Sequence, residues 1–230
     1  MHRSAPRIAR VLACAAVPVL LIAGCSSGSD SSKKSPETSG AAKTSASSAP
    51  AAVKFAKLPD PCKALTPATV ARLVPKAKSA AGTAAKSSDA MARGGCSWNG
   101  LDGYQFRWLD VALQRFDSAQ SSGSGEEQAK KRFTEQVAAA AQIKGATSTK
   151  ADGVGDEATV VSAPVEKDKL KYQDETVVAR TGNVIVILSH NGAGFEDAKT
   201  PAADQLMKDA IAAAKEAVAS VAAANTAANT

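Results

Sequence analysis

The stretch that decides the fold is residues 172–189, YQDETVVARTGNVIVILS. Its centre, the TGN at 181–183, contains glycine and asparagine, which tolerate the positive φ of a tight turn between two strands. The second arm, Val184 to Leu188, is apolar at every position, which is typical of a strand covered on both faces. The stretch therefore predicts a hairpin with a central strand, and we expect an α+β fold in which an antiparallel sheet of about five strands packs against helices.

Three further strands are expected, at residues 96–98, 104–116 and 159–163. In the longest of them, apolar side chains occupy positions 104, 106 and 108 on one face and 109, 111 and 113 on the other. The alternation thus changes phase between Trp108 and Leu109. A β-bulge at that point, or a short break into two strands, is the simplest explanation.

Three helices are expected around this sheet. Thr66 is a good N-cap before Pro67, and Pro75 ends that first helix. The second helix is predicted at residues 126–142 and the third, rich in alanine, at residues 198–222. The third carries an apolar stripe narrow enough for packing on a sheet, formed by Met207, Ile211, Ala214, Val218 and Val221.

The N-terminal segment has the pattern of an export signal. Residues 1–10 carry three arginines and no acid, and residues 11–23 form an apolar run that is too short to span a bilayer. The run ends in Leu21-Ile22-Ala23-Gly24-Cys25, which resembles a bacterial lipobox. We expect residues 1–24 to be a lipoprotein signal peptide and Cys25 to carry a diacylglyceryl group with fatty acids such as palmitate. A transmembrane helix and an ordinary secretory signal are the alternatives.

The rest of the chain divides into a linker, one domain and a tail. Residues 25–55 contain the lipidated cysteine and a Ser- and Ala-rich linker, which we expect to be disordered. Residues 56–222 form one α+β domain, and residues 223–230 form a flexible tail. We therefore expect a monomeric extracytoplasmic protein that is attached to the cell membrane by its lipid.

Charge and cysteine content limit the possible functions. The chain of 230 residues has a formal charge of +6, which falls to +3 once the three leader arginines are removed, and its basic residues are not clustered. This excludes a typical nucleic-acid surface. Apart from Cys14 and Cys25, only Cys62 and Cys96 remain, and in an oxidising compartment they form one disulfide or stay as two separate buried thiols.

No catalytic or metal motif is present in the sequence. His190 is the sole histidine after the leader, so a two-histidine metal site is excluded, and no serine lies in a nucleophile elbow. We expect His190 to be a surface residue at the end of a strand and not a catalytic base. Asp152, Asp156 and Glu157 lack the spacing of a calcium loop. We predict no cofactor, no metal and no enzymatic activity.

Four short motifs, taken together, carry a family resemblance. They are Asp60-Pro61-Cys62 with Leu65-Thr66, Cys96-x-Trp98, Gly153-x-Gly155-Asp156-Glu157-Ala158, and Arg180-x-Gly182-Asn183. Their order resembles a family of actinobacterial lipoproteins known as a domain of unknown function, over roughly residues 59–221. The resemblance implies an α+β fold, a Cys62–Cys96 bridge and a cell-surface location. The domain is also more distantly similar to extracellular sensor domains of actinobacterial receptor kinases.

These observations favour a non-catalytic module of the cell envelope that binds a small molecule, a lipid or a protein partner. Trp98, Arg107 and Trp108 lie in or near the strand with the expected bulge and are the candidate ligand-binding residues. The alternative is a structural or assembly factor of the envelope that acts through protein contacts.

Overall fold

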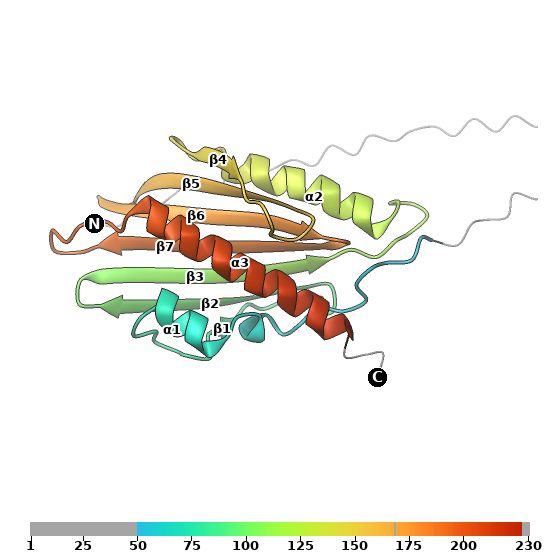
Figure 1. The fold of residues 1–230 in the computed structure, drawn as a ribbon, viewed down its shortest axis with the longest axis horizontal. Helices are drawn as coiled ribbons and strands as arrows, with labels where there is room; N and C mark the ends of the chain where they lie inside the picture. The colour runs from blue at the N-terminus through green and yellow to red at the C-terminus, as the bar shows by residue number, and fades with distance from the viewer. Residues whose placement is uncertain (1–49, 168, 227–230) are drawn as a thin grey trace, which may run out of the picture. The chain divides into compact units, whose positions relative to one another are not determined.

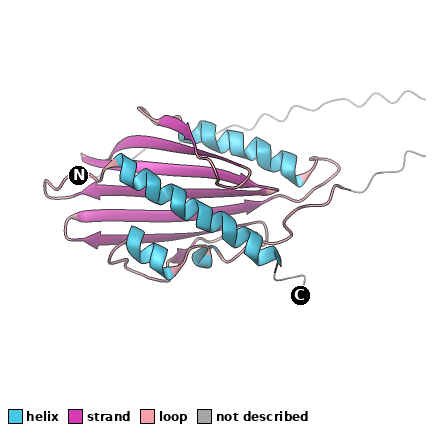
Figure 2. Ribbon diagram, in the orientation of Figure 1, coloured by secondary structure: helices cyan, strands magenta, loops and turns pink. Residues whose placement is uncertain are grey.

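The computed structural model describes residues 50–167 and 169–226 (Figure 1). The expected signal peptide, the lipidation site at Cys25, most of the linker and the end of the tail lie outside these residues. The described chain folds into one antiparallel sheet that is packed against helices (Figure 2).

The sheet has seven strands in the order β1-β2-β3-β7-β6-β5-β4, so the expected number of five is wrong. Their bounds are β1 Thr83–Ala84, β2 Arg93–Asp102, β3 Gln105–Arg115, β4 Thr147–Lys150, β5 Glu157–Lys167, β6 Leu170–Thr181 and β7 Val184–Gly194. The two unexpected strands, β1 and β4, are short edge strands whose residues are all exposed. Such strands lack the apolar alternation by which a buried strand is recognised.

The predicted hairpin is confirmed as the centre of the fold. Strands β6 and β7 pair from Thr181↔Val184 outward, and β7 lies between β3 and β6. Val184, Ile185, Val186 and Leu188 are fully buried, as expected for a strand covered on both faces. At the turn, Gly182 has φ +53°, a value that glycine adopts readily.

The predicted bulge in β3 is wrong. Every residue from Gln105 to Arg115 pairs in one unbroken register with β7, and the pairing with β2 is equally regular. The apolar pattern changes phase because the two halves of the strand bury opposite faces. Leu109, Val111 and Leu113 belong to the main core, whereas Phe106 and Trp108 project from the other side.

The three helices are α1 Pro67–Leu73, α2 Gly125–Ala140 and α3 Ala203–Thr226, and a short 3₁₀ turn, η1, spans Pro61–Lys63. Capping defines two of the starts. The Thr66 side chain accepts from the Thr69 amide, and Ser124 with Glu127 forms a capping box. Helix α3 begins after Pro201, later than expected, and extends past residue 222, where the Asn225 side chain accepts from the Ala56 and Lys57 amides.

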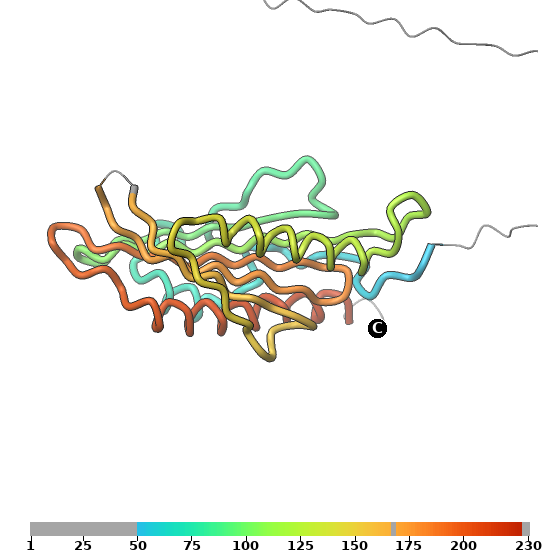
Figure 3. Tube along the Cα trace, turned by 90° about the horizontal axis from the view of Figure 1, so that it is seen from above, coloured from blue at the N-terminus to red at the C-terminus, as the bar shows by residue number. Residues whose placement is uncertain are grey.

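The helices divide the sheet into two unlike faces. Helices α3 and α1 lie on one face, and α2 lies on the other together with the loop between β1 and β2 (Figure 3). The main core fills the space beneath α3, and we call this side the helix-covered face. On the opposite side α2 covers only a small cluster around Ala129, Val178 and Ile185. The remainder, formed by residues 106, 108 and 110 of β3 with their neighbours on β6 and β7, is called the open face.

Candidate functional site

The open face carries a pocket of about 430 Å³ at one end of the sheet. We call it the distal pocket, and its lining residues are Phe106, Trp108, Val165, Tyr172, Asp174 and Asn191. The lining comes from four strands, β3, β5, β6 and β7, so the pocket is built on paired strands and not on loops. Each of these six side chains is partly buried. Three aromatic rings and one carboxylate are thus presented together on a preformed surface.

Strand register sets the dimensions of the pocket. Asn191 of β7 pairs with Trp108 on one side and with Asp174 on the other. In the next row of this face, Ala193 lies between Phe106 and Tyr172 in the same way. Because neighbouring strands lie about 4.8 Å apart, the two walls rise from backbones about 10 Å apart. The pocket is a slot with a floor on β7.

Asp174 is the charged group of the distal pocket. The Thr176 hydroxyl donates to its Oδ2 atom at 3.2 Å, and Thr176 is also 3.1 Å from the Ser189 hydroxyl. Burial raises the pKa of the Asp174 carboxyl, although hydrogen bonds from Thr176 and Asn191 oppose that rise. Among the described residues no cationic side chain forms an ion pair with Asp174. The carboxylate is therefore partly desolvated without a compensating positive charge.

A second hollow of about 490 Å³ lies further along the open face, between the β1–β2 loop and α2. We call it the central groove. Its floor includes Asp110, whose pKa burial raises, and its rim includes Lys86, Arg93 and Arg132. The rim of the central groove carries long basic side chains, whereas the distal pocket is lined by aromatic rings. The distal pocket is for this reason the better candidate for specific recognition.

The distal pocket lies far from the point where the N-terminal segment joins the sheet. Phe55, which is buried, donates its amide to the Asn183 side chain at 2.9 Å beside the β6–β7 turn. β7 begins at Val184, next to this turn, and Asn191 lies seven residues further along it, which at about 3.3 Å per residue is roughly 23 Å. The pocket and the chain entry therefore occupy opposite ends of the sheet.

A family model described as "Protein of unknown function (DUF3558)" matches residues 20–171, about two thirds of the chain. The chain belongs to the DUF3558 family. No curated protein and no solved structure matches the sequence. The DUF3558 match ends within β6, so it includes half of the pocket lining, Phe106, Trp108 and Val165. The other half, Tyr172, Asp174 and Asn191, follows the match.

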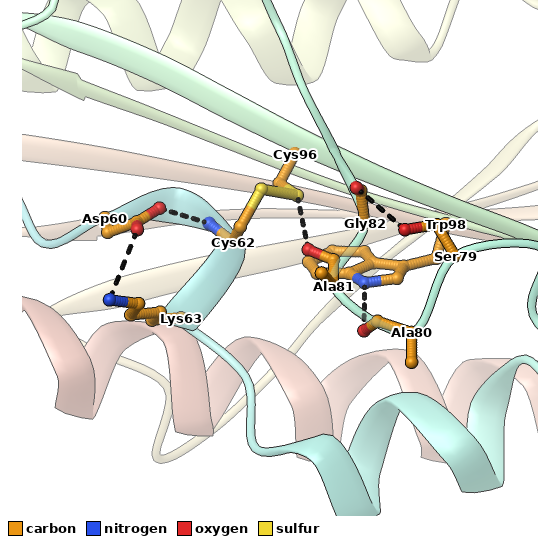
Figure 4. Close-up of a disulfide and its surroundings, with 9 residues drawn as sticks. All are labelled: Asp60, Cys62, Lys63, Ser79, Ala80, Ala81, Gly82, Cys96 and Trp98. Atoms are coloured by element: carbon orange, nitrogen blue, oxygen red, sulfur yellow. Dashed lines mark hydrogen bonds and ion pairs between the residues drawn. A yellow bond between two sulfur atoms is a disulfide. The ribbon is translucent and has the colours of Figure 1, made fainter.

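The predicted disulfide of this DUF3558 member is present. Cys62 in η1 is bonded to Cys96 in β2, with Cα atoms 5.0 Å apart. Trp98 lies beside the bond and its indole nitrogen donates to the Ala80 carbonyl at 3.3 Å (Figure 4). Trp98 is only 1% exposed. It is a core residue of the helix-covered face and does not reach the distal pocket.

The three candidate ligand-binding residues are separated by the sheet. Trp108 lines the distal pocket, but Arg107, its neighbour in the strand, points to the helix-covered face with Trp98. The Arg107 guanidinium donates to the Phe106 carbonyl at 2.8 Å and to Gln105 Oε1 at 3.2 Å. Burial lowers the pKa of Arg107, and nearby Asp209 opposes this effect. Only one of the three therefore belongs to the candidate site.

The two glycine-containing motifs of the family resemblance meet in space at the other end of the sheet. Arg180, which is 5% exposed, donates from Nε to Glu157 at 2.5 Å and from Nη1 to Asp156 at 3.1 Å. Asp156 also accepts from the Gly182 amide at 2.6 Å. Asn183 donates to the carbonyls of Phe55 and Phe116. These contacts fix the β6–β7 turn and the incoming chain, which is a structural role.

His190 lies in the core under α3 rather than at the surface that its strand-end position suggested. It is 1% exposed, its Nε2 atom is 3.2 Å from the Leu73 carbonyl, and its Nδ1 atom has no partner among the described residues. Glu175, paired with His190 across β6 and β7, is also buried, and its Oε2 atom lacks a partner within that same part of the chain. Neither residue lines the distal pocket or the central groove.

Within the part of the chain that the structure describes, no group of three or more His, Cys, Asp or Glu side chains is placed to hold a metal ion. No helix in residues 50–167 and 169–226 is long and apolar enough to cross a membrane.

Proposed function

We propose that this protein is a lipid-anchored module of the cell envelope that binds its ligand non-catalytically in the distal pocket. The observation that carries the proposal is the pocket itself, in which three aromatic rings and Asp174 converge on a slot of about 430 Å³. Pockets of this size with an apolar lining and few polar groups are the usual sites for small ligands. The placement of Asp174 gives such a ligand a fixed orientation.

The position of the pocket fits a tethered receptor. A lipid on Cys25 would hold the chain from its N-terminal side, and the described chain joins the sheet at Phe55, beside the β6–β7 turn and roughly 23 Å along β7 from Asn191. A pocket at the opposite end of the sheet stays accessible when the entry side is held. The lipid anchor, the extracytoplasmic location and the monomeric state are parts of this proposal.

The non-catalytic part of the proposal is supported by the location of His190. This histidine is buried beneath α3, with its Nε2 atom directed to a backbone carbonyl. The groups that line the distal pocket include one carboxylate and no nucleophile paired with a base. Such a set favours binding over chemistry.

Mass spectrometry of the protein purified from membranes tests the anchor. We expect a mature chain that begins at Cys25 and carries the mass of a diacylglyceryl group, whereas a Cys25→Ala variant should be found in the soluble fraction. An intact leader, or an unmodified Cys25 thiol, contradicts the anchor.

A thermal-shift screen with cell-wall fragments and lipids tests the pocket. Ligands should raise the melting temperature of the mature chain and raise it less in a Trp108→Leu variant. Stabilisation that is equal in both proteins would place the site elsewhere.

A second candidate function is assembly through protein contacts, favoured by two exposed apolar side chains at the β2–β3 turn. Leu101 is 47% exposed and Tyr104 is 60% exposed. Pull-down from membranes separates the two functions. A partner lost on Leu101→Ser but retained on Trp108→Leu would support assembly.

A further inference from the structure

We infer that the distal pocket recognises a positively charged nitrogen group, an ammonium or quaternary ammonium carried by a larger ligand. The inference rests on the proposed function, because it assigns ligand chemistry to the same pocket. It depends on the aromatic walls, on the Asp174 carboxylate in one of those walls and on the absence of a cation in the described lining.

The aromatic walls supply the first part of the argument. Phe106 and Trp108 rise from β3, and Tyr172 rises from β6 across the slot. Aromatic faces attract cations through the ring quadrupole, and the attraction is strongest for tryptophan and for partly desolvated sites. Backbones about 10 Å apart leave room between the side chains for one compact group rather than for a flat ring system.

The carboxylate supplies the second part. Asp174 is held by the Thr176 hydroxyl at 3.2 Å, which fixes its orientation in the pocket wall. Among the described residues that line the pocket, none is basic. A partly buried carboxylate is stabilised by an opposite charge nearby, and burial has raised the pKa of Asp174 in the absence of one. A bound cation would supply that charge, whereas an anionic ligand would be repelled.

The size of the pocket indicates that the cation is one end of the ligand. A cavity of about 430 Å³ holds more than a single ammonium group. Val165 and Tyr172 pair across β5 and β6 at the edge of the slot and offer an apolar surface for the remainder. The other possible occupant is a neutral apolar ligand that uses only the aromatic walls.

Two probes of equal shape and different charge separate these occupants. Choline and 3,3-dimethyl-1-butanol differ in that a carbon atom of the alcohol replaces the charged nitrogen of choline. Each would be titrated into the ¹⁵N-labelled mature chain, with amide chemical shifts as the readout of both location and affinity. The variants are Asp174→Asn, Trp108→Leu and, as a matched control on the same face, Asp110→Asn.

We expect shifts at residues 106–108, 172–174 and 191–193, and a choline affinity about tenfold above that of the alcohol. Asp174→Asn should remove most of this tenfold difference and leave the alcohol unaffected. Trp108→Leu should weaken both probes, and Asp110→Asn should change neither. A folded Asp174→Asn protein is recognised by its unchanged binding of the alcohol.

The outcomes distinguish this inference from the proposed function. Equal affinity for both probes in the pocket overturns cation recognition and leaves the pocket as the binding site. Shifts that fall outside the pocket for both probes contradict the inference and the proposed function together. Absence of choline binding up to its solubility limit overturns the inference, and the screen with cell-wall fragments and lipids then decides the proposed function.

Discussion

At the scale of single residues, Gly82 packs directly against the disulfide and the Trp98 ring. Gly82 has φ +76°, and a Cβ atom added there would lie 2.5 Å from Cys96 Sγ and 2.7 Å from Trp98 Cε2. The β1 segment can therefore cross the disulfide only because this residue lacks a side chain.

Gly82→Ala should lower the free energy of unfolding, measured by urea denaturation. Gly103→Ala is a matched control, because Gly103 has φ +57° but no atom within 4 Å of the added Cβ. The control should lose about 1–2 kcal/mol from backbone strain alone. Gly82→Ala should lose about 1–3 kcal/mol more from overpacking. Equal losses in the two variants would show that the contact with the disulfide is not tight.

Arg180 is the buried charged residue whose contacts hold the β6–β7 turn in place. Its guanidinium is buried and contacts Glu157, Asp156 and the Gly182 carbonyl. Arg180→Met removes several hydrogen bonds to charged groups, but the carboxylates left behind are partly exposed, so the variant should lose about 1.5–3 kcal/mol in urea denaturation. The exposed Arg93→Met serves as a control and should cost little. A loss below about 1 kcal/mol for Arg180→Met would contradict this role.

His190 and Glu175 should make stability depend on pH in opposite directions. Burial raises the pKa of Glu175 and lowers the pKa of His190. For Glu175 the raised folded pKa means that stability is lost as pH rises above the unfolded value of about 4.3 and through the folded value. For His190 the lowered folded pKa means that stability is lost as pH falls below about 6.5.

A Glu175→Gln variant isolates the first effect. Its amide oxygen can still accept from Ser162 and Gln173, which contact Glu175 Oε1 at 2.8 and 3.0 Å. The free energy of unfolding of the variant relative to the natural protein should therefore increase between about pH 5 and pH 8. A difference that stays constant over this range would show that Glu175 does not titrate as its burial predicts.

At the scale of elements, α3 approaches the sheet through small side chains. Ala210, Ala213, Ala214 and Ala217 are all fully buried against it. A larger side chain at this contact must displace the helix. Ala214→Leu should lower the melting temperature and cost about 1–3 kcal/mol. Ala219→Leu, on the exposed side of the same helix, should be nearly neutral. Similar effects at both positions would mean that α3 adapts without strain.

The elements also show what the sequence can predict. The β6–β7 hairpin and the α1 start were predictable because their signals are local, a turn at Gly182 and a cap at Thr66. The prediction of a bulge in β3 was wrong because a phase change in one strand can arise in two ways. It can come from a bulge, or from two halves of a regular strand that bury opposite faces, and only the packing on each face distinguishes them. Edge strands β1 and β4 carry no apolar signal and depend on their partners.

The candidate site was predictable only in part. Trp108 was identified as an aromatic residue near the phase change, and that phase change is the one signal that Phe106 and Trp108 share a second face. Asp174 and Asn191 were missed because their position beside Trp108 is set by pairing between β3, β7 and β6. No local pattern specifies such pairing. Arg107 was assigned to the site because neighbours in sequence were treated as neighbours in space.

At the scale of the whole molecule, the two faces and the two ends of the sheet carry different structural features. The helix-covered face holds the core and the disulfide, and the end near Phe55 receives the N-terminal segment. The open face at the opposite end carries the aromatic pocket. The central claim is that this open face is the surface that binds ligand.

The most direct test of that claim is amide chemical-shift mapping of the ¹⁵N-labelled mature chain with solubilised cell-wall fragments and lipids. We predict that perturbed amides cluster at residues 105–110, 172–176 and 189–193, around the distal pocket. Perturbations that cluster on α1, α3 or the Cys62–Cys96 bridge would place the binding surface on the helix-covered face and contradict the claim.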